Sequence, residues 1–219
     1  EQWRDVLPGE IIRIKKNSLE SIYLHPQSQL SLCTFEILYF SHENSILDKY
    51  NVKKIRQNLA TKLALLEDYS IVSNSDIVIG IPDTGITLGK AYAKHLGLEY
   101  QQLITKNPQA SRTFIVKSVK DRKNACINKF IYQEDKLYGK NVIIVDDTIV
   151  RGTVISAIIE RLKNIGVKQI HIRIPAPPVI DVCHLGISIQ NKQELIITGH
   201  TIEEVREKNN LVYSISSAK

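Results

Sequence analysis

The chain has 219 residues, of which 43% are hydrophobic and 24% are charged, a composition ordinary for a soluble globular protein. This length predicts one domain with one main core and a small appendage, and no apolar run is long enough to cross a membrane. The net charge of +6 comes from Lys and Arg residues spread along the chain, which argues against a nucleic-acid partner.

The cysteine content indicates the compartment. Three cysteines without close pairing argue against a disulfide framework and favour a reducing environment. No secretory signal opens the chain. We therefore expect a cytoplasmic protein.

Residues 1–26 predict a β-hairpin. Pro8 and Gly9 turn the chain, residues 10–14 and 19–23 are expected to be strands, and Asn17-Ser18 is the turn between them. An isolated hairpin is marginally stable in water. This one therefore needs another surface, or another chain, to lie on.

A core segment and a helix are expected next. Residues 35–40 are mainly apolar and predict core. Residues 52–66 carry apolar side chains at helical spacing, which predicts an amphipathic surface helix. These side chains are Ile55, Leu59, Leu63 and Leu66.

A strand over residues 77–81 runs into the turn sequence PDTG, residues 82–85. The following helix is expected to begin near Thr87 and to end at Gly97, a favourable C-terminal cap. A strand that ends in a short glycine-containing turn at a helix start can bind an anion. An ordinary β-turn without a ligand is the alternative.

A third strand is predicted over residues 99–104, followed by the sequence KNPQASRTFI, residues 106–115. The basic segment that follows, residues 116–129, predicts a solvated helix face. A supporting role near a bound anion is the alternative for this segment.

The most informative stretch is NVIIVDDTIVRGT, residues 141–153. Its apolar start predicts a buried parallel strand, and its end predicts a phosphate-sized loop at a helix N-terminus, where amides and the helix dipole attract anions. Asp146 and Asp147 would repel phosphate. A neutral or cationic group is therefore expected beside them, and a ribose diol or a hydrated magnesium ion meets that requirement.

The remaining elements complete an α/β fold. A helix over residues 154–165 ends at Gly166, a strand covers residues 169–174, Thr201 and Glu204 form a capping box that opens a last helix, and residues 211–215 add a strand. Repeated βα units predict an open, mainly parallel sheet with helices on both faces. The 82–87, 106–112 and 146–153 loops would all lie at its carboxyl edge.

Three segments resemble the type I phosphoribosyltransferases. The sequence Val145 to Thr153 resembles their loop for phosphoribosyl pyrophosphate (PRPP). Its final Arg-Gly-Thr, residues 151–153, is similar to the glutamine PRPP amidotransferase branch in particular. PDTG resembles their pyrophosphate loop. Residues 106–115 resemble the mobile loop that closes over PRPP, although residues 108–111 depart from the family pattern, so we expect less complete closure.

The resemblance implies a division into domains and a metal content. Residues 1–26 are similar to the last hairpin of a glutaminase domain that is otherwise missing, and residues 27–219 are similar to the phosphoribosyltransferase domain. One branch of the amidotransferases holds an iron–sulfur cluster. Cys33 and Cys183 match two of its ligands, but the later Cys-x-x-Cys pair is absent, so we expect Mg²⁺ and no iron–sulfur cluster.

The activity implied is transfer of ammonia nitrogen to C1 of PRPP, giving 5-phosphoribosylamine and diphosphate, the first step of de novo purine biosynthesis. Its other implied partners are a purine nucleotide inhibitor, a glutaminase domain or subunit, and further copies of the chain in a homo-oligomer. The resemblance assigns these residues: Lys106 and Arg112 as catalytic; Asp146, Asp147, Thr148, Ile149, Val150, Arg151, Gly152 and Thr153 to PRPP; Thr84, Gly85, Ile86 and Thr87 to diphosphate; and Asp146 and Asp147 to magnesium, directly or through water.

Two alternatives stay open. A salvage phosphoribosyltransferase would use a nucleobase in place of ammonia, and no convincing aromatic hood for a base is visible in the sequence. A regulatory module would bind PRPP or a nucleotide without turnover, which the altered mobile loop permits. None of the cysteines lies near the start of the chain, so we expect no glutaminase activity from these 219 residues.

Overall fold

The computed structural model describes residues 4–26, 29–109, 128–201 and 204–205. The chain divides after Glu36 into two compact units, residues 1–36 and residues 37–219, and each is described by itself. The assignment of residues 1–26 to a glutaminase remnant, and of residues 27–219 to a transferase domain, stays a prediction.

The first unit contains the predicted hairpin. Strand β1 (Glu10–Lys15) pairs antiparallel with β2 (Ser18–Leu24), with an irregularity between Ile11 and Ile12. The hydrogen bonds from Arg4 hold the pKa of Glu10 at about 2. All of β2 is exposed, and Ile14 of β1 keeps 77% of its surface accessible. The hairpin is therefore confirmed, with largely uncovered apolar side chains.

The second unit is built on a parallel sheet. Strands β5 (Ile77–Gly80), β8 (Asn141–Val145) and β9 (Gln169–Arg173) lie in the order β5-β8-β9, and both pairings are parallel. All four residues of β5 are buried, as are the last four of β8. Continuous apolar runs of this kind are typical of parallel strands covered on both faces.

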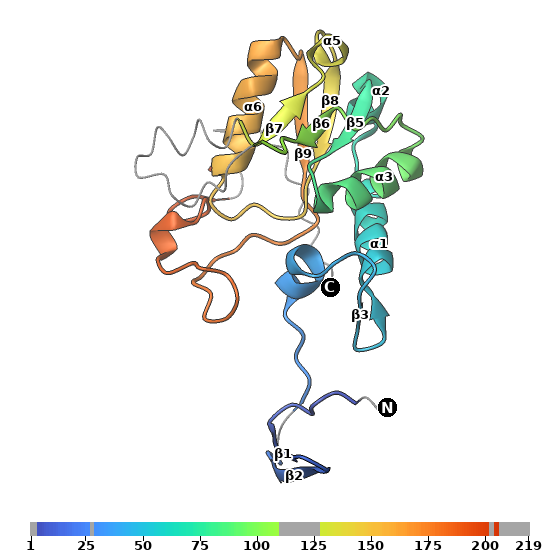
Figure 1. Ribbon diagram of the computed structural model, residues 1–219. Coiled ribbons are helices and arrows are strands. Elements are labelled where there is room, and N and C mark those ends of the chain that lie inside the picture. Colours follow the sequence, from blue (N-terminus) through green and yellow to red (C-terminus); the bar gives the residue numbers. More distant parts are fainter. Residues whose placement is uncertain (1–3, 27–28, 110–127, 202–203, 206–219) are drawn as a thin grey trace. The chain divides into compact units, whose positions relative to one another are not determined.

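Helices cover the two faces of this sheet (Figure 1). Ile144 points into a core shared with Leu162 of α6 (Thr153–Ile165). Ile143 points the other way, into a core shared with Leu63 of α1 (Val52–Ala64) and Leu88 of α3 (Thr84–Leu96). Because successive strand residues face opposite sides, one strand serves two cores. The predicted α/β architecture with helices on both faces is confirmed.

The ends of the helices follow the predicted signals. Gly97 ends α3 and Gly166 ends α6, both in the left-handed conformation, with φ of +69° and +94°. The predicted capping box is also present: the Thr201 amide donates to the Glu204 carboxylate at 2.7 Å, and the Glu204 amide donates to the Thr201 hydroxyl at 3.2 Å.

Shorter elements connect this framework. They are the π-helix η1 (Glu36–Phe40), the pair β3 (Ile46–Leu47) and β4 (Tyr50–Asn51), α2 (Tyr69–Asn74), the pair β6 (Ile104–Lys106) and β7 (Phe130–Tyr132), α5 (Glu134–Leu137) and the 3-10 helix η3 (Lys192–Glu194).

The third predicted strand is wrong in extent. Within residues 99–104, Tyr100 alone bridges in parallel to Val78, and regular pairing starts only at Ile104. From there β6 pairs antiparallel with β7, which the sequence pattern did not indicate. Pairing between segments more than twenty residues apart is a tertiary choice, and local patterns carry little of it.

Two predicted helix boundaries also need correction. Helix α3 begins at Thr84, not near Thr87, so the turn residues form its first turn. Helix α1 ends at Ala64, and Leu66 lies beyond it with 51% of its surface exposed. The buried residues of α1 are Val52, Arg56, Ala60, Leu63 and Ala64, so the predicted Leu63 is confirmed and the rest of the buried face is rotated from the predicted stripe.

Some predictions fall outside the described residues: most of the basic helix at 116–129, the closing strand at 211–215, and Arg112 and Cys126. Among the residues that are described, no helix combines the length and apolar character needed to cross a membrane.

Candidate functional site

The loops after β5 and β8 touch through their backbones. A Cβ atom on Gly85, in the first turn of α3, would lie 2.5 Å from the Val145 carbonyl oxygen and 3.4 Å from the Asp146 carboxylate. A Cβ on Gly80 would overlap the carbonyl of Gly85. The glycines therefore let the predicted diphosphate loop press against the start of the predicted PRPP loop.

Asp146 and Asp147 occupy the carboxyl end of β8. Asp147 is 3% exposed, whereas Asp146 is half-buried. The Asp147 amide donates to the Asp146 carboxylate at 2.9 Å, and the Thr148 hydroxyl donates to Asp147 at 3.0 Å. The Thr84 side chain also lies close enough to Asp147 to lower the pKa of that carboxyl group. One residue of the diphosphate loop thus contacts one residue of the PRPP loop.

The two carboxyl groups are poorly solvated. Burial and the neighbouring charge of Asp147 raise the pKa of Asp146 well above its ordinary value. Burial also raises the pKa of Asp147, and the hydrogen bonds from Thr84 and Thr148 only partly oppose this. A ligand that brings hydroxyl donors or a cation would relieve the cost of two adjacent buried charges.

Arg56 is a candidate residue that the sequence reasoning missed. This arginine of α1 is 3% exposed and donates to the carbonyls of Ile37 at 2.9 Å and Ser41 at 2.8 Å. Burial lowers its pKa, while the charge of Asp147 opposes that shift. Arg56 is thus a buried cation whose charge interacts with that of Asp147, and helical spacing gave no signal for it.

Glu43 was also missed. Its carboxylate accepts a hydrogen bond from the Thr87 hydroxyl in the predicted diphosphate loop, and it pairs with Lys53 at 3.0 Å. The bonds from Thr87 and Lys53 lower the pKa of Glu43. In this conformation an internal carboxylate therefore holds a hydroxyl that was assigned to diphosphate.

Lys106, like Thr87, is held by a carboxylate of the same chain. It ends β6 and forms an ion pair with Asp83, beside a cis peptide bond between Pro82 and Asp83. Both side chains are at least half exposed. The lysine predicted to assist diphosphate release thus lies at the diphosphate loop.

The remainder of the predicted PRPP loop leads into α6. Gly152 caps this helix in the left-handed conformation with φ of +75°, and the exposed Thr153 begins it. Ile149 instead packs into the core with 8% exposure, so its side chain is structural. Residues 148–153 therefore offer backbone amides and hydroxyls at a helix N-terminus, an arrangement suited to phosphate.

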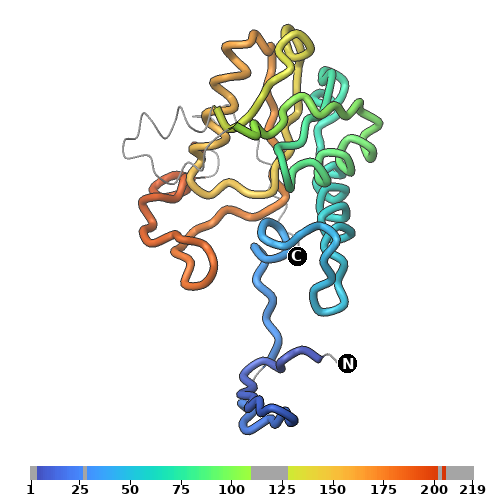
Figure 2. Tube along the Cα trace, viewed as in Figure 1, coloured from blue at the N-terminus to red at the C-terminus, as the bar shows by residue number. Residues whose placement is uncertain are grey.

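A later segment, residues 188–196, is hydrogen-bonded to this loop. Arg151 donates to Glu194 at 2.7 Å and to the Ser188 carbonyl at 2.5 Å, and the Ile196 amide donates to the Val150 carbonyl at 2.9 Å. Figure 2 shows the returning segment, coloured orange to red, beside the loop. Arg151 therefore anchors a neighbouring segment as well as belonging to the predicted PRPP loop.

The carboxylate pair fits part of a magnesium site. Magnesium commonly takes one or two carboxylates and fills its other positions with substrate oxygens and water. Asp146 and Asp147 supply that number. The described part of the chain contains no group of three or more His, Cys, Asp or Glu residues arranged to hold a metal by themselves.

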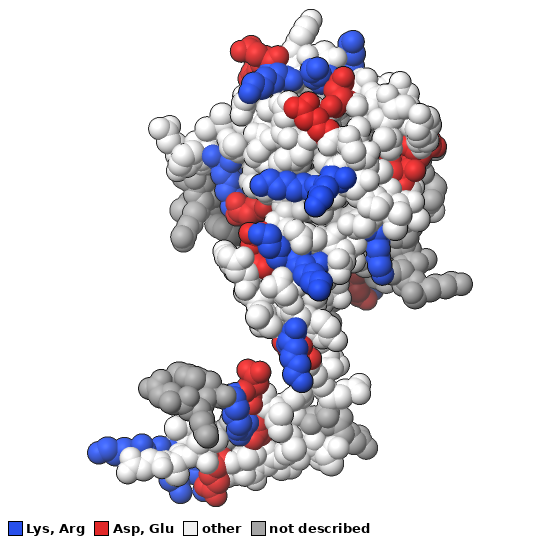
Figure 3. Space-filling model, turned by 90° about the vertical axis from the view of Figure 1, so that its right-hand side faces the viewer, with Lys and Arg blue, Asp and Glu red and all other residues white. Residues whose placement is uncertain are grey.

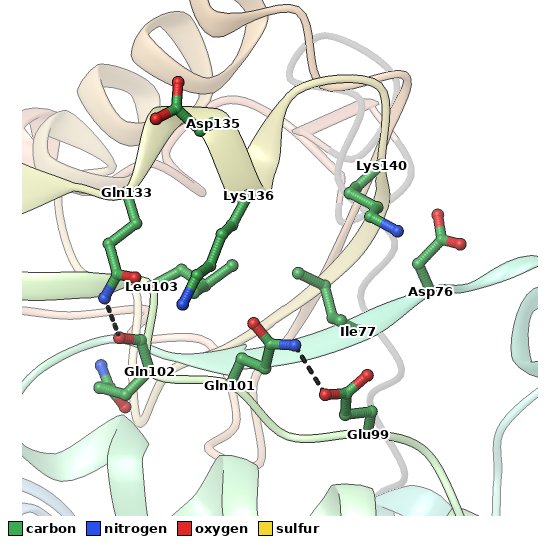
Figure 4. A pocket seen from close by; sticks show the side chains of 10 residues that line it. All are labelled: Asp76, Ile77, Glu99, Gln101, Gln102, Leu103, Gln133, Asp135, Lys136 and Lys140. Atoms are coloured by element: carbon green, nitrogen blue, oxygen red, sulfur yellow. Dashed lines mark hydrogen bonds between the residues drawn. The ribbon is translucent and has the colours of Figure 1, made fainter.

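A cavity of about 670 Å³ lies away from these loops, at the amino ends of β5 and β8 (Figure 4). Charges of both signs line it, and Asp76 is already bonded to the Asn141 amide at 2.7 Å. Figure 3 likewise shows basic and acidic side chains interspersed over the visible face of the second unit. The cavity is lined by Asp76, Ile77, Glu99, Gln101, Gln102, Leu103, Gln133, Asp135, Lys136 and Lys140.

Comparisons with known proteins agree with this geometry. Residues 44–176 match the family model described as "Phosphoribosyl transferase domain". An amidophosphoribosyltransferase of Archaeoglobus fulgidus is 36% identical over 202 residues, which is 92% of this chain and 43% of that protein. The human amidophosphoribosyltransferase is 33% identical over 217 residues, covering 96% of this chain and 41% of that protein.

A solved structure is also similar. It is a glutamine PRPP amidotransferase from B. subtilis complexed with ADP and GMP, and it matches with a TM-score of 0.81 and 33% identity. The match covers 96% of this chain and 46% of the solved chain. The chain therefore spans less than half the length of these relatives.

Proposed function

Because the chain belongs to the phosphoribosyl transferase domain family, we propose that it transfers ammonia nitrogen to C1 of PRPP, giving 5-phosphoribosylamine and diphosphate. The observation that carries the proposal is the contact between two loops: a Cβ atom on Gly85, in the loop after β5, would lie 2.5 Å from the Val145 carbonyl oxygen and 3.4 Å from the Asp146 carboxylate. A sugar that carries both a diol and a diphosphate would fit across such a junction. The named relatives support ammonia as the acceptor.

Each part of PRPP has a proposed position. The ribose hydroxyls donate to Asp146 and Asp147, the 5′-phosphate accepts from the amides and hydroxyls of residues 148–153, and diphosphate lies on residues 84–87. The bond from C1 to diphosphate breaks, ammonia forms the new bond to C1, and the nitrogen then releases a proton. Asp146 and Asp147 would also hold Mg²⁺, which neutralises charge on diphosphate when bound.

The protein's contribution is mainly positioning and charge stabilisation. Lys106 would exchange Asp83 for the departing diphosphate. Arg112 is proposed to do the same from the mobile loop. Because residues 108–111 depart from the family pattern, we propose slow turnover accompanied by hydrolysis of PRPP to ribose 5-phosphate, the reaction that loop closure suppresses.

The proposed partners follow from the relatives. A glutaminase domain or subunit would supply the ammonia. A purine nucleotide would act as inhibitor, which the ADP and GMP in the solved relative support. We also propose a homo-oligomer that works in the cytoplasm.

Two measurements on the 219-residue chain test the proposal. Calorimetric titration with PRPP and Mg²⁺ should show binding, and an assay with ammonium salts should show diphosphate release that increases with pH, because more ammonia is then unprotonated. Glutamine without added ammonia should not support release. Absence of PRPP binding would reject the proposal, and hydrolysis of glutamine by this chain would reject the proposed nitrogen source.

A binding module without turnover is the second candidate. The internal contacts favour it, since Asp83 holds Lys106 and Glu43 holds Thr87 in the predicted diphosphate loop. Tight PRPP binding without diphosphate release, at any ammonia concentration, would support this candidate over the enzyme.

A further inference from the structure

A buried ion pair includes Arg173, the residue whose backbone carbonyl accepts the Asp146 amide. Arg173, the last residue of β9, has no exposed surface, and its guanidinium donates to both oxygens of Glu67, at 2.5 and 2.6 Å. The side chain of Glu67 is 3% exposed. Two parallel hydrogen bonds of this kind fix the orientation of both partners as well as their separation.

The ion pair joins three elements of the second unit. Glu67 lies in the connection between α1 and α2, Arg173 ends β9, and the Tyr92 hydroxyl of α3 donates to Glu67. Burial alone would raise the pKa of Glu67, but the bonds from Arg173 and Tyr92 outweigh it and hold the pKa below its ordinary value. The carboxylate therefore stays charged and keeps all three elements together.

Both ends of this network reach the candidate site. The Arg173 carbonyl accepts the Asp146 amide at 3.2 Å, so the backbone of β9 holds the first carboxylate. Helix α3, which carries Tyr92, begins at Thr84, and a Cβ atom on its second residue, Gly85, would lie 2.5 Å from the Val145 carbonyl oxygen and 3.4 Å from the Asp146 carboxylate. One network thus supports the start of the carboxylate-bearing loop from the strand side, through Arg173, and from the helix side, through α3.

A buried ion pair of this kind contributes little net stability, so stability does not explain its presence. The cost of removing two charges from water offsets most of their attraction, and apolar replacements of similar volume are often neutral or stabilising. A fixed geometry is what an apolar pair would not supply. The consequence of the ion pair should therefore appear in the relative placement of the two loops.

We infer that Glu67 and Arg173 are positioning residues, which hold the Asp146–Asp147 pair in register with residues 84–87 so that a single PRPP molecule contacts both. The inference rests on the proposed function. It implies that ligands spanning the two loops depend on the ion pair more strongly than ligands that contact one loop.

The test compares spanning and single-loop ligands. The double variant Glu67→Gln/Arg173→Met removes both charges together and keeps an amide for the Tyr92 hydroxyl. Its Kd for PRPP with Mg²⁺ should rise about tenfold or more, because small displacements of positioning groups have large effects. Its Kd for inorganic diphosphate and for ribose 5-phosphate should change less than about threefold, or under ~0.7 kcal/mol.

A matched control uses an exposed ion pair of the same unit. Arg161 pairs with Glu134, with side chains 36% and 52% exposed. Glu134→Gln/Arg161→Met should leave all three dissociation constants unchanged. Thermal unfolding should show a cooperative transition for both double variants, which separates loss of affinity from loss of fold.

The outcomes are distinct. Unchanged PRPP affinity in the folded Glu67→Gln/Arg173→Met variant would overturn the inference, and equal weakening of all three ligands would do so by showing a purely structural role. Absence of PRPP binding by the unmodified chain would overturn the proposed function, and the inference with it.

If the double variant does not fold, Tyr92→Phe removes one hydrogen bond only. It should weaken PRPP about twofold to fivefold and spare diphosphate, and equal effects on both would overturn the inference.

Discussion

Asp146 and Asp147 lie where burial raises the pKa of each carboxyl group above its unfolded value. A carboxyl group of this kind favours the folded state while it is protonated. That contribution is complete below the ordinary pKa of 3.8 and is lost as the pH rises through the folded-state pKa. Above the folded-state pKa values the ligand-free protein therefore bears the cost of two buried charges that serve a ligand.

The double variant Asp146→Asn/Asp147→Asn tests whether these carboxylates lower stability while they provide affinity for PRPP. It should lose PRPP binding, because the ribose hydroxyls no longer meet charged acceptors, yet melt about 2–4 °C higher at neutral pH. The gain should shrink as the pH falls through the raised folded-state pKa values and should vanish below 3.8, the ordinary pKa, where the carboxyl groups are neutral in both states. Calorimetry across this pH range measures both effects, and retained PRPP affinity would reject the assignment of these residues.

Gly152 and Thr153 give a second contrast at the residue scale. Gly152 has φ of +75°, and a Cβ there would lie 2.5 Å from Cδ1 of Ile196. Gly152→Val should therefore cost about 2 kcal/mol or more of unfolding free energy and abolish phosphate binding. Thr153→Val removes a single exposed hydroxyl, so it should change stability by about 0.5 kcal/mol or less and weaken binding moderately.

A second substitution separates strain from overlap. Adding Ile196→Ala to Gly152→Val should recover part of the stability, since it opens space, while the backbone strain persists. Full recovery would show that the left-handed conformation of Gly152 carries no cost.

The helices and strands differ in how well the sequence predicted them. Apolar runs and capping residues predicted β8, α6 and the ends of α3 and α6, because these signals are local. The antiparallel pairing of β6 with β7 was missed, since the partner of Ile104 is Tyr132, far along the chain. The motif residues of the site were predicted for the same reason as the caps, but their roles still rest on the resemblance.

Residues that reach the site from other elements were missed. Arg56 lies on a helix that was predicted as a surface helix, yet its guanidinium is bonded to carbonyls of residues 37 and 41. Glu43 follows an apolar segment and meets Thr87 across more than forty residues of sequence. A polar residue in the wrong place for an amphipathic pattern is the only local sign of such contacts.

The contact between β6 and the diphosphate loop leads to a prediction at the scale of elements. Asp83→Asn should release Lys106 and tighten diphosphate binding about twofold to tenfold, whereas Lys106→Ala should weaken it. Titration calorimetry at low and high salt measures both changes. The difference between the variants should shrink at high salt, because both side chains are exposed. Equal affinities at low salt would argue against a role for Lys106.

At the scale of the whole molecule, the buried core belongs to the second unit. Every buried hydrophobic residue among those described lies at or after Leu38, and the hairpin leaves most of its apolar side chains exposed. A chain of residues 37–219 should therefore unfold within about 3 °C of the longer chain, a change of ~1 kcal/mol. Scanning calorimetry of both chains tests this, and a much lower transition would show that residues 1–36 support the core.

The glycine contacts beneath the two loops also bear on which sequence changes the site can accept. Gly80, Gly85 and Val145 meet through main-chain atoms, so the spacing of the loops is independent of their side chains. Saturation mutagenesis with selection for PRPP binding should return glycine alone at positions 80 and 85. New acceptor specificities could then evolve by exchanging outward side chains on an unchanged backbone.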